Sequence, residues 1–164
     1  MMIRFGILTL SDRSARGERA DTSGLELARL IQAEGWSLVK QAILPDNEDD
    51  IRARLIEWSD SGEVDVILTT GGTGFSPRDV TPEATKAVID RDAPGLAEAM
   101  RTAGLKITPH SMLSRAVAGI RKRTMIINLP GSPKGAVENL QVVLPVLPHA
   151  VQLLSDDPAS EASH

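Results

Sequence analysis

The chain has 164 residues and a formal net charge of -4, and this charge disfavours nonspecific nucleic-acid binding. It has no cysteine, which excludes disulfides, thiolate chemistry and cysteine zinc sites. No apolar run approaches the ~20 residues that span a bilayer, and the start of the chain lacks the layout of a signal peptide. We therefore expect a cytoplasmic enzyme or binding protein with no membrane or nucleic-acid partner, folded as one domain over residues 1–154.

Apolar runs of strand length alternate with stretches of helical periodicity. This alternation implies right-handed crossovers and a mostly parallel sheet covered on both faces. Segment 107–119, which Pro109 interrupts, fits neither pattern, and 155–164 is predicted to be a loose polar tail. In chain order we predict a strand at 3–10, a polar linker at 14–20, a helix from 21 or 22 to 35, a strand at 36–44, a helix at 49–58, a strand at 64–68, helices at 81–90 and from 94, a strand at 124–129, and helices at 134–143 and 145–154.

The most informative stretch follows the third strand, where Gly71, Gly72 and Gly74 stand within four residues. Glycines permit positive φ and let backbone N–H groups approach a ligand closely, while Thr73 adds a hydroxyl. The spacing matches neither a P-loop nor a dinucleotide-binding fingerprint. A tight strand-to-helix turn without a ligand is therefore an equal alternative at this point.

Arg78 and Asp79 follow the glycines, and Thr81 is placed to cap the next helix. The arginine suits a phosphate group, and the carboxylate suits either a metal ion or the arginine beside it. The alternative for this pair is a local surface ion pair. Asp46, which follows the second strand, is likewise either a Mg²⁺ ligand or the N-cap of the next helix.

Polar segments follow four of the predicted strands. Parallel strands place such segments along one carboxyl edge, where open α/β sheets bind ligands. We therefore expect one site, in which glycine amides and arginines contact anions and two aspartates bind Mg²⁺. The segments are Ser11-Asp12-Arg13, Asp46, 71–79 and Pro130-Gly131-Ser132.

Four motifs resemble those of the molybdopterin adenylyltransferase family, of the MogA/MoaB type, over residues 4–154. The third motif is highly specific, and the order and spacing of all four agree with the family. The motifs are Ser11-Asp12-Arg13 with Gly17 and Asp21-x-Ser23-Gly24; Leu44-Pro45-Asp46; Thr69-Thr70-Gly71-Gly72-Thr73-Gly74 with Arg78-Asp79-Val80-Thr81-Pro82-Glu83-Ala84; and Leu129-Pro130-Gly131-Ser132-Pro133.

The resemblance implies a three-layer α/β/α sandwich with a mostly parallel central sheet, commonly trimeric, that transfers AMP from ATP to the terminal phosphate of molybdopterin with Mg²⁺ and releases pyrophosphate. It also implies contact with the metal-insertion enzyme of the same pathway. Asp46 and Asp79 match the family's functional aspartates and are the catalytic and metal-binding candidates. The substrate-binding candidates are Ser11, Asp12, Arg13, Thr70, Gly71, Gly72, Thr73, Gly74, Arg78, Ser114, Pro130, Gly131 and Ser132.

Three alternatives remain at the level of sequence. A noncatalytic paralogue would keep the molybdopterin pocket as a scaffold without turnover. A nucleotide pyrophosphatase of the competence-damage type would share the fold and a similar glycine loop. Within the site itself, Arg78 is either a phosphate contact or a brace for the loop.

Overall fold

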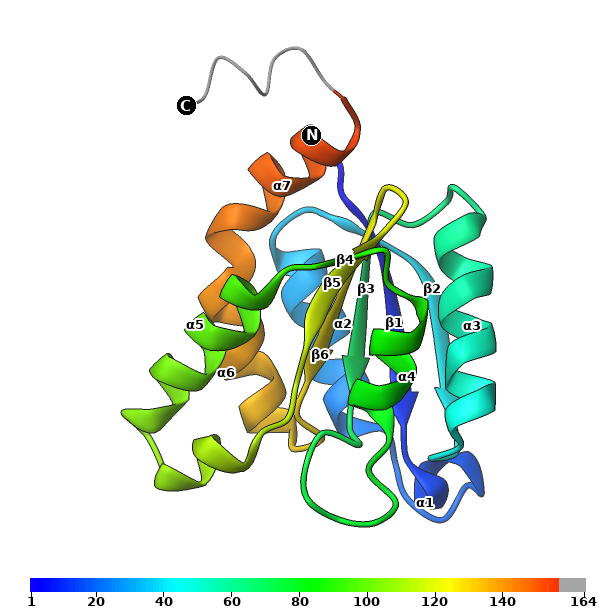
Figure 1. The fold of residues 1–164 in the computed structure, drawn as a ribbon, viewed down its shortest axis with the longest axis vertical. Coiled ribbons are helices and arrows are strands. Elements are labelled where there is room, and N and C mark those ends of the chain that lie inside the picture. Colours follow the sequence, from blue (N-terminus) through cyan, green and yellow to red (C-terminus); the bar gives the residue numbers. More distant parts are fainter. Residues whose placement is uncertain (157–164) are drawn as a thin grey trace.

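The carboxyl ends of four parallel strands meet at one edge of the sheet in this computed structural model, which describes residues 1–156 (Figure 1). Two further strands continue the sheet in antiparallel pairing. The predicted mostly parallel sheet is therefore confirmed. In sheet order the strands are β2 (Ser37–Leu44), β1 (Arg4–Leu10), β3 (Val66–Thr70), β6 (Thr124–Leu129), β5 (Ala118–Arg121) and β4 (Arg91–Asp92).

Two groups of helices cover the two faces of the sheet, which makes the predicted three-layer sandwich (Figure 1). Successive residues of a strand point to opposite faces, so Val66 and Leu68 pack with α2, α5, α6 and α7, whereas Ile67 packs with α3 and α4. No helix in the described part of the chain is long and apolar enough to cross a membrane. The helices are α1 (Asp12–Ala15), α2 (Thr22–Ala33), α3 (Glu48–Asp60), α4 (Thr81–Val88), α5 (Pro94–Leu105), α6 (Pro133–Val143) and α7 (Leu147–Leu154), with 3₁₀ turns η1 (Pro109–Leu113) and η2 (Leu144–Val146).

The structure decides the caps of two helices that the sequence left open or assigned differently. Asn47 caps α3, because its side chain accepts a hydrogen bond from the Asp50 amide, so Asp46 is not the N-cap. Thr81 is the first residue of α4 rather than its cap. Its hydroxyl instead donates to the Gly71 carbonyl at 2.9 Å, which ties the helix to the glycine loop.

Two regions form structure that the hydrophobic pattern did not predict. The short helix α1 overlaps the expected linker 14–20, because the Ser11 hydroxyl accepts from the Ser14 amide and caps it. In the unassigned segment 107–119, η1 forms and β5 begins. Strand β4 has only two residues and exists through its pairing with β5. Of the predicted tail 155–164, residues 157–164 lie outside the described part of the chain.

A buried amide links the layers directly behind the carboxyl edge. Asn128 of β6 is fully buried, and its Nδ2 donates at 3.0 Å both to Thr69 Oγ1 of β3 and to Thr85 Oγ1 of α4. Its Oδ1 accepts from the Val117 amide at 3.2 Å. Helix α4, which follows the glycine loop, is thereby held on the sheet by polar contacts as well as by packing.

Asn128→Leu keeps a similar side-chain size but leaves the Val117 amide and two hydroxyls without this partner. We expect the free energy of unfolding, measured by urea denaturation, to fall by about 3 kcal/mol. Gln141→Ala, on the exposed face of α6, is the control and should change it by less than about 0.5 kcal/mol. A loss below about 1 kcal/mol for Asn128→Leu would contradict this role for the amide.

Candidate active site

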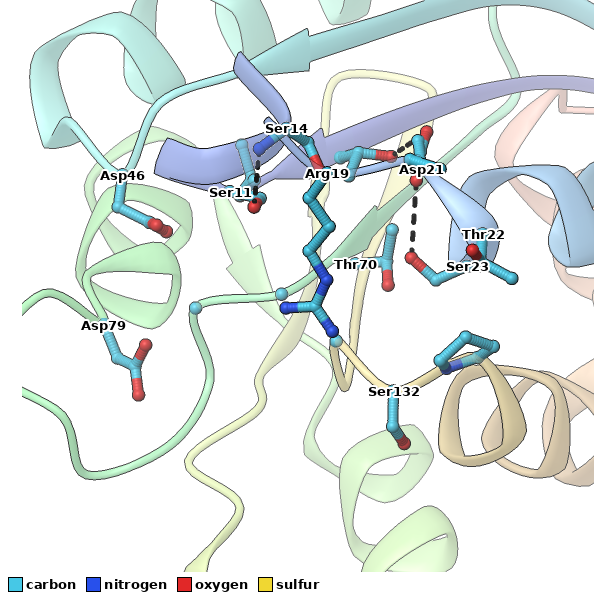
Figure 2. Close-up of a pocket in the computed structure, with 17 residues that line it drawn as sticks. Ser11, Ser14, Arg19, Asp21, Thr22, Ser23, Asp46, Thr70, Asp79 and Ser132 are labelled. Carbon is cyan, nitrogen blue, oxygen red and sulfur yellow. Dashed lines mark hydrogen bonds between the residues drawn. The ribbon is translucent and has the colours of Figure 1, made fainter. Parts of the chain in front are cut away.

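A polar cavity of about 380 Å³ lies at the carboxyl edge of the parallel strands (Figure 2). Each of β1, β2, β3 and β6 delivers residues to it at the point where the strand ends. Because these ends share one edge, segments that are distant in sequence form one wall. The cavity, called the first cavity below, is lined by Thr9, Leu10, Ser11, Ser14, Arg19, Ala20, Asp21, Thr22, Ser23, Asp46, Thr70, Gly71, Gly72, Asp79, Gly131, Ser132 and Pro133.

Backbone geometry explains the glycines at its centre. Gly71 and Gly72 have φ of 105° and 70°, a region that side chains strongly disfavour. A Cβ on Gly72 would also collide with the Thr81 hydroxyl and lie 3.2 Å from Asp46 Oδ1. Among the described residues, none accepts a hydrogen bond from the amides of Gly72 and Gly74. The loop thus offers unpaired main-chain donors next to a carboxylate.

Asp46 places a half-buried carboxylate in the lining of this cavity. Its Oδ2 accepts from the Asp12 amide at 3.2 Å, and its own amide donates to Asp12 Oδ1 at 2.9 Å. Its Oδ1 is buried and has no hydrogen-bond partner. Burial raises the pKa of Asp46 above the usual carboxyl range, and the negative charges of Asp12 and Asp79 raise it further. Such a carboxylate is suited to a cation.

Asp79 faces the same cavity from the loop that follows β3, and Figure 2 shows it on the same side as Asp46. Its Oδ2 accepts from the Ser76 amide at 3.1 Å. Within residues 1–156, no cluster of three acidic or histidine side chains is placed to hold a metal ion alone. Two carboxylates nevertheless fit Mg²⁺, which usually takes its remaining ligands from phosphates and water.

A second cavity, of about 620 Å³, adjoins the first. The two cavities share Gly72, Asp79, Gly131 and Ser132 as lining residues. Of the other binding candidates, Thr73, Gly74, Ser114 and Pro130 line the second cavity only. Its outer wall is more apolar and includes Phe75, Ile107 and Leu113, which the sequence did not single out because their apolar character reads as ordinary core.

Three candidates line neither cavity. Arg13 is exposed outside both of them. Arg78 donates to both carboxylate oxygens of Asp12, at 3.0 and 2.9 Å, and its hydrogen bonds lower the pKa of Asp12 below the usual range. Asp12, Arg13 and Arg78 are therefore not among the lining residues of either cavity, and their part in substrate binding stays a prediction. Arg78 and Asp12 instead tie the glycine loop to α1, and Asp12 supports the backbone of Asp46.

Arg115 braces the loop that carries Asp79. Its guanidinium donates at 2.8 Å to the carbonyls of Gly74 and Asp79 and to the carboxylate of Glu83. Its amide also donates to the Thr73 carbonyl at 2.8 Å. These contacts join both ends of the 74–79 segment to one side chain, so the position of Asp79 depends on an arginine 36 residues away.

Sequence reasoning missed several residues of the first cavity. Arg19 belongs to the segment interpreted as a polar linker, and Ser14 lies in α1. Asp21 and Ser23 were noted only as part of a motif and a helix cap. The signal that they shared was their position in the segment that leads into the first turn of α2, whose start lies at the cavity, but no spacing rule points their side chains inward.

Comparison with known proteins agrees with this geometry. The family model described as a probable molybdopterin binding domain matches residues 6–149. The molybdopterin adenylyltransferase of Helicobacter pylori strain J99 is 41% identical, over 93% of this chain and 88% of that enzyme. The chain belongs to this family.

Other members extend the comparison. This probable molybdopterin binding domain is similar to gephyrin of Dictyostelium discoideum, with 44% identity over 94% of this chain. It spans only about a quarter of the length of that protein and of the Drosophila melanogaster protein cinnamon, which are the first curated relatives it matches. Among solved structures, the molybdopterin biosynthesis enzyme MoaB of Thermus thermophilus has a TM-score of 0.90 and 52% identity, covering 96% of this chain and 99% of that one.

The buried, unpartnered Oδ1 of Asp46 leads to a prediction for the stability of the protein without ligand. Because its pKa is raised in the folded state, the wild-type protein loses stability as the pH rises above the usual carboxyl pKa. Asp46→Asn removes this loss, so we expect a higher melting temperature than wild type at pH 7 and a smaller difference at pH 4. Calorimetry of both proteins across this pH range measures the effect.

The matched control is Asp92→Asn, which changes an exposed carboxylate in β4. Its melting temperature should follow that of the wild-type protein at every pH. An Asp46→Asn protein that melts below wild type at pH 7, or a gap that widens toward acid, would contradict the burial argument.

Proposed function

We propose that this chain is a molybdopterin adenylyltransferase, which transfers AMP from ATP to the terminal phosphate of molybdopterin and releases pyrophosphate. The observation that carries the proposal is the meeting of two cavities at Gly72, Asp79, Gly131 and Ser132. A group transfer between two substrates needs two adjoining binding sites, so that the reacting atoms meet where the sites join. The similarity to the Helicobacter pylori adenylyltransferase over nearly all of both chains supports the same activity.

In the proposed reaction, a phosphate oxygen of molybdopterin attacks the α-phosphorus of ATP. One phosphorus–oxygen bond forms, and the bond from the α-phosphorus to the bridging oxygen breaks, so pyrophosphate leaves with the electron pair. Both reactants are polyanions, and catalysis requires in-line positioning and neutralisation of charge. We assign the positioning to the shared wall, where the unpaired amides of Gly72 and Gly74 donate to phosphate oxygens.

Asp46 and Asp79 would hold Mg²⁺ in this reaction. The buried, unpartnered Oδ1 of Asp46 supports this assignment, since an unpaired buried carboxylate oxygen is costly without a cation. When bound, Mg²⁺ supplies positive charge to the phosphates. Arg115 keeps the carboxylate of Asp79 directed at the wall by holding the Gly74 and Asp79 carbonyls. Because the substrates are ATP and a cofactor precursor, we place the reaction in the cytoplasm.

The direct test is incubation of the protein with molybdopterin, ATP and Mg²⁺, followed by detection of adenylylated pterin and pyrophosphate. We expect both products in equal amounts and none when the cation is chelated. Hydrolysis of the nucleotide without pterin would indicate a pyrophosphatase instead. Pterin binding without consumption of ATP would indicate a scaffold.

Asp79→Asn tests the carboxylate itself. The substitution keeps the size of the side chain and an oxygen that can accept from the Ser76 amide, so we expect a folded protein that still binds the pterin. Adenylyl transfer should fall roughly a hundredfold or more, on the scale of removing one electrostatic group. Full activity in a folded Asp79→Asn protein would reject this role.

We also propose that the chain assembles as a homotrimer. Support comes from a shallow apolar surface between α5 and α6, lined by Pro94, Leu96, Ala99, Val142 and Val146, among others. The Val146 residue is 49% exposed. Light scattering should report three times the chain mass for wild type, and Val146→Glu should lower it. A monomeric wild-type protein would contradict the proposal.

Contact with the metal-insertion enzyme of the pathway stays a prediction.

A further inference from the structure

Arg19 is a cation in the first cavity that has no part in the contacts described above. It lies between α1 and α2 and lines the cavity together with Gly71, Gly131 and Ser132. Figure 2 shows its side chain extending into the cavity rather than away from it. Arg19 is exposed to solvent, and its guanidinium is directed into the cavity.

The charges around Arg19 set it apart from the neighbouring arginines. Arg16 pairs with Glu18 at 3.0 Å, Arg78 with Asp12 at 2.9 Å and Arg115 with Glu83 at 2.8 Å. Among the described residues, no carboxylate oxygen lies within ion-pair distance of Arg19, and none accepts a hydrogen bond from its guanidinium. Its planar set of N–H donors is therefore unused in the protein alone.

Asp21, two residues after Arg19, already accepts hydrogen bonds from other groups. Asp21 accepts from the Thr9 hydroxyl at 2.8 Å and from the Gly24 amide at 2.9 Å, so its carboxylate serves the cap of α2. In Figure 2, Asp46 and Asp79 lie on one side of Arg19 and Ser23 and Ser132 on the other. The side of the cavity with Ser23 and Ser132 thus carries hydroxyl groups and one carboxylate, that of Asp21, which already caps α2.

Two helices begin on the side of the cavity with Ser23 and Ser132. Ser132 caps α6 by accepting from the Gly135 amide at 3.1 Å, and Thr22 opens α2. The partial positive charge at the start of α6 adds to the charge of the guanidinium, whereas the Asp21 carboxylate already caps the start of α2. A phosphate held there would lie beside Gly71 and Gly131, away from the carboxylates of Asp46 and Asp79, and Arg19 would supply the only full positive charge from the first cavity's lining.

We propose that Arg19 is a substrate-binding residue that holds a phosphate group by its guanidinium, independently of the divalent cation. This inference rests on the proposed function for the identity of the substrate. The phosphate belongs either to the polyphosphate of ATP or to the phosphomonoester of molybdopterin. Both groups offer phosphate oxygens, to which an arginine guanidinium can donate two parallel hydrogen bonds.

The first experiment needs no turnover. Inorganic pyrophosphate is titrated calorimetrically into the protein in the presence of EDTA, for wild type, Arg19→Gln and Arg19→Lys. We expect Arg19→Gln to bind about tenfold more weakly, the scale of losing one charged hydrogen bond, with Arg19→Lys between the two. Equal melting temperatures of the variants would show that folding is unaffected.

Arg16→Gln is the matched control. It removes the same charge from the same linker, its residue lines neither cavity, and its exposed ion pair with Glu18 contributes little to stability. It should bind pyrophosphate as wild type does. Equal weakening by Arg16→Gln and Arg19→Gln, no weakening by either, or no binding to wild type would each overturn the proposal, whether or not the chain is an adenylyltransferase.

Steady-state kinetics then identify the source of the phosphate. A raised KM for ATP in Arg19→Gln assigns the site to the polyphosphate, and a raised KM for molybdopterin assigns it to the phosphomonoester. Unchanged KM values for both substrates would overturn the role in the reaction. A wild-type protein without adenylyltransferase activity would instead reject the proposed function. The pyrophosphate titration would then be the test of phosphate binding by Arg19.

Discussion

The close approach of two main-chain segments at Gly71 and Gly131 is the constraint on which the site depends. A Cβ on Gly131 would lie 3.3 Å from the Cα of Gly71, and the Gly71 amide donates to the Leu129 carbonyl at 3.1 Å. Positive φ at Gly71 and Gly72 then turns the chain at the end of β3. The glycine part of the boundary between the two cavities is therefore built from backbone, and its amides stand where side chains would otherwise block a ligand.

The electrostatics of the site follow from where this wall places the acids. Asp46 is held by reciprocal hydrogen bonds with Asp12, yet keeps one buried oxygen without a partner. Asp12 forms an ion pair with Arg78, whose positive charge offsets only part of the effect that burial and the neighbouring acids have on Asp46. A half-buried carboxylate with one buried oxygen left without a partner is suited to a cation.

Much of the fold and the position of the site could be predicted from sequence, but individual side chains could not. The segments after β1, β2, β3 and β6 do meet, as the order of strands implied. Arg78 and Arg13 were expected inside the pocket and lie outside it, whereas Arg19 lies inside it. An arginine spans several bonds, so the position of its Cα does not determine where its guanidinium lies. Local propensity likewise favoured Thr81 as a cap, but the Gly71 carbonyl competed for its hydroxyl.

The sequence by itself determined the layered architecture and the edge at which ligands bind, because hydrophobic periodicity and glycine position act over a few neighbouring residues. Only the tertiary structure decided the partners of the charged groups. The pairing of β4 with β5, the amide network of Asn128 and the brace from Arg115 to Asp79 each join residues that are far apart in the chain. Such contacts depend on the packed arrangement of the whole sheet, which no local pattern encodes.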